Sequence, residues 1–267
     1  MKLTPSKTRP VITTLDIETA PLKVWAWGLW DQNTGLEQIG DEWTILSFAA
    51  KRLGEDKIDY MDTGGWGRAK VRSDRQLLKR LWQILDDTDI VIAQNGQSFD
   101  LRKINARLLM HNFLPYSPIR IIDTKLAAQR YFAFTSNKLA WLGKHLTNSP
   151  KDEHHGFPGF ELWAECLKDN PRAWREMKKY NIQDVLATEK VYLKMRPWIE
   201  GHPNVATYGA ALERECPRCG SRRIRSAGLR RTQVGVYQRF RCLQCGGYAR
   251  HRRMSNTISQ RDNLLVQ

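Results

Sequence analysis

Two acidic residues near the N-terminus have the type and spacing of a metal site. Asp16 and Glu18 lie two residues apart at the end of the apolar run 11–15, so both carboxylates belong to one face of the predicted strand. Neighbouring carboxylates repel each other and raise each other's pKa unless a cation neutralises them. The pair therefore predicts a divalent-metal site. For the pair alone, a solvent-facing strand end is the simpler alternative.

Further acidic and aromatic groups follow later in the chain. The segment 90–100 predicts a buried strand, a glycine-containing turn and Asp100 at the start of a helix, where an aspartate alone has the simpler role of a cap. Tyr180 and Asp184 are four residues apart in a long helical segment, so they share one helix face. As an isolated pair they could form a surface contact. The order and spacing of all these groups predict that they converge on one cleft.

Four cysteines near the C-terminus predict a second metal site. Cys216 and Cys219 form one C-x-x-C pair, and Cys242 and Cys245 form another. Four thiolates in this pattern are typical of a structural, tetrahedral zinc ion, and a reducing cytosol disfavours the alternative of disulfides. The segment resembles a zinc ribbon, with a hairpin between the pairs. Such a closed site leaves no position open for catalysis.

The elements that must position these groups alternate along the chain. Strands are predicted over the apolar runs 11–15, 44–50, 57–61, 90–93 and 119–122. Helices are predicted from an N-cap at Ser73 through Leu85, and over 100–110, 138–146 and 172–195. This order favours an α/β fold with a mixed sheet flanked by helices. Core packing is the expected role of Trp25, Trp27 and Trp30, and stacking on the end of a substrate is the alternative.

Charge and cysteine content divide the chain near residue 200. Residues 1–200 hold 30 Lys and Arg against 25 Asp and Glu, a net of +5, whereas residues 201–267 hold 13 Arg, no Lys and 3 acids, a net of +10. The turn-forming sequence Gly201-His202-Pro203-Asn204 supports a boundary within 201–207. We therefore predict one large domain over 1–200, and a basic linker, zinc ribbon and tail over 201–267.

The charge of the tail indicates a polyanionic partner. The whole chain has a formal charge of +15, which favours nucleic acid over other partners. A zinc ion with four thiolates contributes about −2, so the tail keeps about +8. A tether to another protein is the alternative. The candidate phosphate contacts are arginines of the tail, namely Arg222, Arg223, Arg225, Arg230, Arg231, Arg239 and Arg241.

Aromatic residues lie among these arginines. Tyr237, Phe240 and Tyr248 could stack on bases, but core packing is the favoured interpretation in so small a module.

Three segments, taken in order, resemble a known family. Asp16-Ile17-Glu18-Thr19, the segment 95–100 and the segment 180–184 resemble the three motifs of the DEDD superfamily of 3′ to 5′ exonucleases, which have a ribonuclease H-like fold. The resemblance covers most of residues 10–199. Tyr180 lies four residues before Asp184, and Lys179 occupies the position five residues before it, where a histidine would stand in the other subclass. In this respect the chain is similar to the tyrosine (DEDDy) subclass. The chain is most similar to the exonuclease domain of family B DNA polymerases and to stand-alone, often phage-encoded relatives.

The resemblance implies a chemistry. It implies a 3′ to 5′ exonuclease that hydrolyses phosphodiester bonds at DNA 3′ ends with two Mg²⁺ or Mn²⁺ ions. Asp16 would bridge both ions, Glu18 and Asp184 would hold the ion on the nucleophile side, and Asp100 would help to hold the other. Tyr180 would orient the attacking water, because an ordinary tyrosine pKa near 10 makes a poor base.

The resemblance also implies partners. Thr19 and Asn95, within the motifs, would contact single-stranded DNA or a frayed 3′ end, and a DNA polymerase or other replication protein is a further candidate partner. The alternatives are an RNA-directed or structure-specific nuclease on the same fold and a non-catalytic nucleic-acid-binding factor. No apolar run approaches the roughly 18 residues of a membrane span, and residues 1–10 have no signal-peptide pattern. We therefore expect a cytoplasmic protein of a bacterial or phage-infected cell, with no membrane partner.

Overall fold

The chain divides into two compact units, one over residues 11–192 and a C-terminal unit that includes residues 193–267. The structure is a computed structural model that describes residues 9–148, 154, 156–209 and 213–266. The division falls within α6 (Pro171–Met195). The domain boundary within 201–207 stays a prediction. Among the described residues, no helix has both the length and the apolar character needed to cross a membrane.

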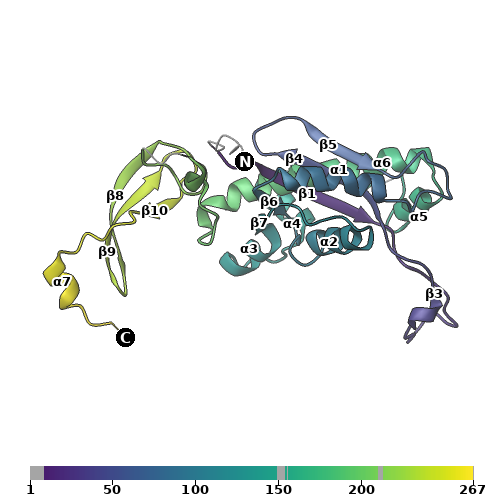
Figure 1. Cartoon of the computed structure of the whole chain (residues 1–267), viewed down its shortest axis with the longest axis horizontal. Coiled ribbons are helices and arrows are strands. Elements are labelled where there is room, and N and C mark those ends of the chain that lie inside the picture. The colour runs from purple at the N-terminus through teal and green to yellow at the C-terminus, as the bar shows by residue number, and fades with distance from the viewer. Residues whose placement is uncertain (1–8, 149–153, 155, 210–212, 267) are drawn as a thin grey trace. The chain divides into compact units, whose positions relative to one another are not determined.

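A mixed five-stranded sheet forms the centre of the larger unit (Figure 1). Its strand order is β5-β4-β1-β6-β7, and β1 pairs antiparallel with β4 but parallel with β6. This mixed sheet confirms the predicted fold class. The strands are β1 (Ile12–Thr19), β4 (Ile45–Arg52), β5 (Ile58–Asp62), β6 (Ile90–Ala93) and β7 (Arg120–Asp123).

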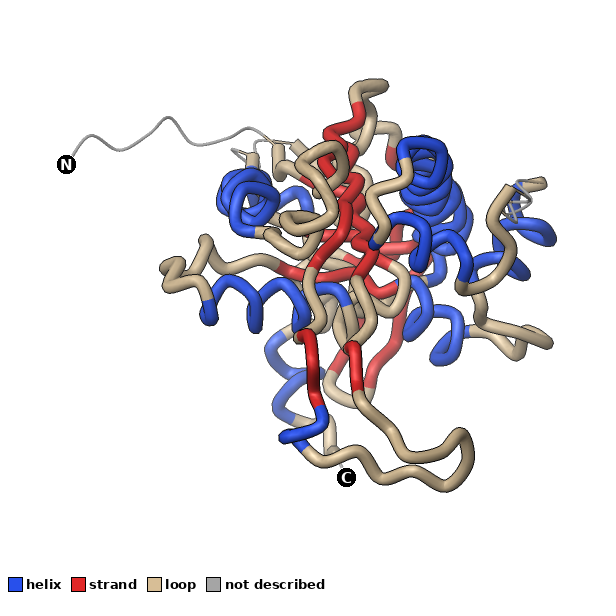
Figure 2. Tube along the Cα trace, turned by 90° about the vertical axis from the view of Figure 1, so that its right-hand side faces the viewer, coloured by secondary structure: helices blue, strands red, loops and turns tan. Residues whose placement is uncertain are grey.

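Helices cover the strands on both sides, as Figure 2 shows. Side chains alternate along β1, so Leu15 and Ile17 are buried in a core with leucines of α1 and with Ile104 of α2. Asp16, between them, is hydrogen-bonded to Asn181 of α6. The opposite face of β1 is thus the acidic one, turned toward α6. The helices are α1 (Arg75–Asp86), α2 (Asp100–Met110), α3 (Thr124–Tyr131), α4 (Leu139–Thr147), α5 (Glu161–Leu167) and α6.

The start of α1 differs from its prediction. Ser73 does not cap the helix, which has Asp74 at the N-cap position without a capping hydrogen bond. The Asp74 carboxylate is fully buried and accepts two hydrogen bonds of 2.8 Å from Arg107 of α2. It also accepts one from the backbone N–H of Ile45. A buried carboxylate needs partners that offset its desolvation. The hydrogen bonds of Asp74 therefore join the start of α1 to α2 and β4 and do not cap the helix.

An arm between β1 and β4 was not predicted. It consists of β2 (Lys23–Val24), η1 (Leu36–Gln38) and β3 (Ile39–Asp41), and it extends away from the sheet in Figure 1. The expected core packing of Trp25, Trp27 and Trp30 is wrong, because all three side chains are exposed and Trp27 is 98% exposed. The paired segments are too short to bury them.

The C-terminal unit contains a three-stranded antiparallel sheet with the order β10-β9-β8. Its strands are β8 (Ile224–Thr232), β9 (Gly235–Cys242) and β10 (Tyr248–Arg250). The first cysteine pair, Cys216 and Cys219, precedes β8. The second pair, Cys242 and Cys245, lies where β9 ends and the chain turns into β10. The remaining elements are η2 (Arg196–Trp198), η3 (Val205–Tyr208) and α7 (Ile258–Asp262).

Candidate active site and cysteine cluster

Three of the four predicted carboxylates meet at one place. Ligand oxygens of Asp16, Glu18 and Asp184 lie within 4.8 Å of one another. β1 presents the first two at its end, where its pairing with β4 shifts register after Glu18, and α6 brings Asp184. Oxygens around an octahedral Mg²⁺ with bonds of 2.0–2.1 Å are about 3 to 4 Å apart. The cluster therefore fits a divalent cation after small side-chain adjustments.

The fourth carboxylate, Asp100, reaches β1 from α2. Its Oδ1 accepts a hydrogen bond of 3.1 Å from the backbone N–H of Ile17, the residue between Asp16 and Glu18. Its side chain is only 2% exposed. Burial raises the pKa of Asp100 to about 7, and the charge of Asp123 adds to this, while the Ile17 hydrogen bond opposes it. Asp100 is thus a buried acid beside the cluster, where a cation would favour its ionised form.

Replacing Asp100 by asparagine should stabilise the protein when no Mg²⁺ or Mn²⁺ is added. The pKa of Asp100 is higher in the folded protein than in the unfolded chain. The free energy of unfolding of the wild type should therefore decrease as pH rises from about 4 to about 7. Asparagine does not ionise, so the variant should melt at least about 3 °C higher at pH 8 and equally at pH 4. Melting curves at both pH values test this. A wild type and variant with parallel pH dependence would contradict the raised pKa.

Two donors from helices orient the acids of β1. Asn181 of α6 is fully buried, donates from Nδ2 to Asp16 Oδ2 over 2.5 Å, and accepts from Ser47 Oγ at 3.2 Å. Trp163 of α5 donates from Nε1 to Glu18 Oε2 over 3.2 Å. Such partners fix the rotamers of ligating carboxylates. Both were missed in the sequence.

The sequence signals for these two donors differ. Asn181 lies three residues before Asp184 in the third motif, and that spacing places the two on one helix face. It could have been found there. Trp163 had no comparable signal, because α5 itself was not predicted.

Tyr180 lies within an aromatic group beside the acids. Its side chain is 9% exposed, and its ring meets those of His154 and Trp163 edge to face, with centroids 5.1 and 5.9 Å apart. His154 Nδ1 lies 2.7 Å from the carbonyl oxygen of Phe157 and donates to it. Because Trp163 also holds Glu18, the position of the phenol is coupled to that of a carboxylate.

The turn before α2 is held by Asp123. Its carboxylate accepts hydrogen bonds of 3.1 Å from the backbone N–H groups of Asn95 and Gln97. It also accepts hydrogen bonds of 3.0 and 3.1 Å from those of Lys125 and Leu126. It therefore caps α3 and ties that helix to the segment that leads to Asp100.

Glycine and a left-handed residue shape the same turn. A Cβ on Gly96 would lie 2.4 Å from Ala93 Cβ, so only glycine fits. Asn95 has a φ of +65°, which asparagine tolerates, and its Oδ1 accepts from Lys125 Nζ at 3.2 Å. Thr19 ends β1. Nucleic-acid contacts of Thr19 and Asn95 stay predictions.

The four cysteines form a separate cluster in the C-terminal unit. Their sulfur atoms lie within 4.8 Å of one another, with 3.6 Å from Cys216 to Cys245 and 3.7 Å from Cys219 to Cys242. Sulfurs at 2.3 Å around a tetrahedral zinc are about 3.8 Å apart. The cluster fits zinc in both number and separation of ligands.

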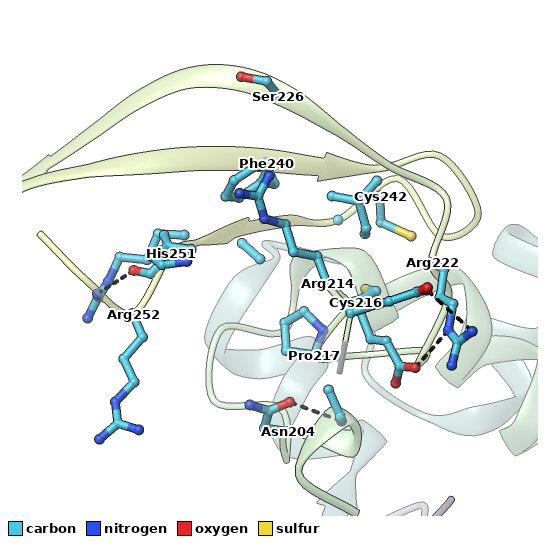
Figure 3. Close-up of a pocket in the computed structure, with 17 residues that line it drawn as sticks. Asn204, Arg214, Cys216, Pro217, Arg222, Ser226, Phe240, Cys242, His251 and Arg252 are labelled. Carbon is cyan, nitrogen blue, oxygen red and sulfur yellow. Dashed lines mark hydrogen bonds and ion pairs between the residues drawn. The ribbon is translucent and has the colours of Figure 1, made fainter. Parts of the chain in front are cut away.

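Each cysteine pair is closed by the same backbone turn. The N–H of Gly220 donates to the carbonyl of Cys216 over 2.9 Å, and that of Gly246 donates to Cys242 over 3.0 Å. Both glycines have positive φ, +69° and +79°, which side chains disfavour. Figure 3 shows Cys216 and Cys242, one from each pair, at the edge of a hollow in this unit.

The structure does not gather all the predicted arginines on one surface. Arg222 forms ion pairs with Glu213 and Glu215 at 3.3 and 3.1 Å (Figure 3), and Arg223 precedes β8. Arg231 pairs with Val236, so the two side chains lie on the same face of the sheet. The other face of the sheet carries Arg225, Arg230, Arg239 and Arg241.

Comparison with known proteins agrees with this architecture. Residues 33–196 match the RNase_H superfamily, so the chain belongs to that superfamily, and its sheet has the ribonuclease H-like arrangement. The matched region contains Asp100, Tyr180 and Asp184 but begins after Asp16 and Glu18. No curated protein matches the chain.

One similar solved structure is that of the family B DNA polymerase from the hyperthermophilic archaeon Pyrobaculum calidifontis. It has a TM-score of 0.50 and 12% sequence identity, and the match covers 79% of this chain but 28% of the polymerase chain. At this identity the likeness concerns the fold alone.

Proposed function

We propose that this protein is a metal-dependent 3′ to 5′ exonuclease of the DEDDy type that acts on DNA 3′ ends. The observation that carries the proposal is the convergence of Asp16, Glu18 and Asp184, with Asp100 bonded to the backbone between the first two. Membership of the RNase_H superfamily supports it. A purely structural role does not account for four carboxylates around one strand end, because their repulsion needs a cation.

The chain's own residues have distinct roles in this proposal. Asp16, Glu18, Asp100 and Asp184 would hold two Mg²⁺ or Mn²⁺ ions. Such ions, when bound, supply an activated water and charge stabilisation at the phosphate. Asn181 and Trp163 keep two of the carboxylates in their ligating rotamers. Tyr180 positions the attacking water through its hydroxyl, while its ring is held by His154 and Trp163.

The proposal includes one structural Zn²⁺ on the four cysteines, which makes the C-terminal unit a zinc ribbon. The fit of the sulfur separations to tetrahedral zinc supports this. The ribbon would increase the hold on nucleic acid or dock the enzyme to a DNA polymerase or another replication protein.

Cleavage of labelled strands tests the proposal. Single-stranded DNA and RNA of one sequence, labelled at the 5′ end, are incubated with Mg²⁺, without divalent ions, and with an Asp16→Ala variant. We expect a ladder that shortens from the 3′ end of DNA, only with Mg²⁺ and only with the wild type. A preference for RNA would move the substrate class to RNA. Intact strands under all conditions would reject the nuclease.

A further inference from the structure

One face of the C-terminal sheet carries mainly arginine and tyrosine. Residues opposite each other on paired strands point to the same side, and so do residues two apart on one strand. The pairing of β9 with its neighbours therefore places seven side chains on one face, in three rows. We call this surface the Arg–Tyr face; its rows are Arg225, Arg241 and Tyr248, then Arg239 and Arg250, then Arg230 and Tyr237.

A bulge in β8 is required for this arrangement. Arg225 and Arg230 are five residues apart, so in a regular strand they would point to opposite sides. The register shifts between Ser226 and Leu229, and Gly228 within it has a φ of +83°. The extra residue reverses the alternation and returns Arg230 to the side of Arg225.

The Arg–Tyr face has an electrostatic cost within the protein. Arg225 lies directly opposite Arg241, and Arg239 lies opposite Arg250, although like charges in such positions destabilise a sheet. In the described part of this unit, the carboxylates that form ion pairs with arginine do so with Arg222. The four arginines of these two opposed pairs have no such partner there. A polyanion lying along the rows would offset the repulsion.

Tyr248 gives the Arg–Tyr face a place for an unpaired base. Its side chain is 46% exposed, and the guanidinium groups of Arg239 and Arg241 lie 5.3 and 5.7 Å from its ring centre. The Nε of Arg239 donates to the carbonyl of Ala227 over 2.8 Å, which fixes that guanidinium beside the ring. An exposed ring with cations close to it can stack on a base while the cations bind the neighbouring phosphates.

We propose that the Arg–Tyr face binds an unpaired strand of nucleic acid, with one base stacked on Tyr248 and flanking phosphates bound by Arg225, Arg239 and Arg241. The opposite face of the sheet differs in the exposure of its ring: Phe240, in one row with Ser226 and Ala249, is only 7% exposed, and the guanidinium of Arg214 lies 4.9 Å from its ring centre. The binding does not depend on cleavage, so it can be tested separately from the proposed nuclease activity.

The test measures binding of labelled oligo-dT, oligo-rU and a short DNA duplex by full-length protein carrying Asp184→Ala, which prevents degradation. Tyr248→Ala should weaken binding of both single strands roughly 5- to 150-fold and leave duplex binding unchanged. Tyr248→Phe should restore single-strand binding, because the ring remains. A preference between oligo-dT and oligo-rU would identify the sugar.

A charge-matched pair separates this face from net charge. Arg241→Gln and Arg261→Gln remove the same charge, but Arg261 lies on α7, outside the sheet. Arg241→Gln should reduce the salt dependence of binding by about 0.7 in the log–log slope, the value for one phosphate contact with a single strand, while Arg261→Gln should not. Equal effects of both, or unchanged single-strand binding by Tyr248→Ala with full zinc content, would overturn the proposal.

Discussion

Asp184→Ala is expected to abolish cleavage. Asp184 is the carboxylate that α6 adds to the two on β1, so its loss leaves the proposed cation site without a ligand from that side. Loss of a supporting partner of a metal ligand costs about 10- to 100-fold, and loss of the ligand itself should exceed this. Cleavage rates at saturating Mg²⁺, measured over a range of protein concentrations, give the comparison.

Tyr180→Phe is the control for this variant, because it changes the same face of α6 but removes only a hydroxyl. The phenylalanine ring keeps the contacts with His154 and Trp163, so the carboxylates should remain in place. We expect slower but measurable cleavage, since the metal ions that the carboxylates would hold would supply most of the activation of the water. Equal and complete loss in both variants would contradict a role of Tyr180 limited to orienting water.

The second large effect is expected from the cysteine cluster. Cys242 ends β9, the central strand of the small sheet, and a structural zinc supplies about 10–16 kcal/mol of apparent binding energy to a fold that forms with it. Cys242→Ser should therefore unfold the C-terminal unit and reduce zinc content from one ion per chain toward none. Zinc analysis and limited proteolysis with mapping of the cut sites measure this.

Cys166→Ser is the matched control. Cys166 is a fully buried thiol of α5, in the larger unit, so its loss can lower stability without touching the cluster. It should retain one zinc ion and an uncut C-terminal unit. If both variants keep zinc equally, the cluster is not the zinc site.

The spacing of residues predicts much of the larger unit because its signals are local. Asp16 and Glu18 alternate with Leu15 and Ile17, and this pattern predicts which face of β1 packs in the core with the leucines of α1. The helix that starts at Asp100 and the long helix with Tyr180 and Asp184 also show clear periodicity. These elements carry every group that was predicted for the cluster.

What the sequence does not predict depends on contacts between distant residues. The hydrogen bond from Trp163 to Glu18 joins residues 145 positions apart, and nothing in the local sequence of α5 points to it. The expected cap at Ser73 also fails because of a distant contact: Asp74, the residue at the N-cap position, pairs with Arg107, 33 positions away. In the small sheet, a single bulged position decides which arginines share a face, and hydrophobic periodicity does not reveal it.

The chain order of the acidic residues has a consequence for synthesis of the protein. Asp16 and Glu18 lie on the first strand, whereas Asp184 lies on α6, the last helix to enter the larger unit. Domains generally fold as units, the N-terminal one first, as the ribosome extends the chain. A nascent chain stalled before α6 would hold two of the clustered acids and lack the third. One stalled just after α6 could complete the acidic site before the cysteine unit exists.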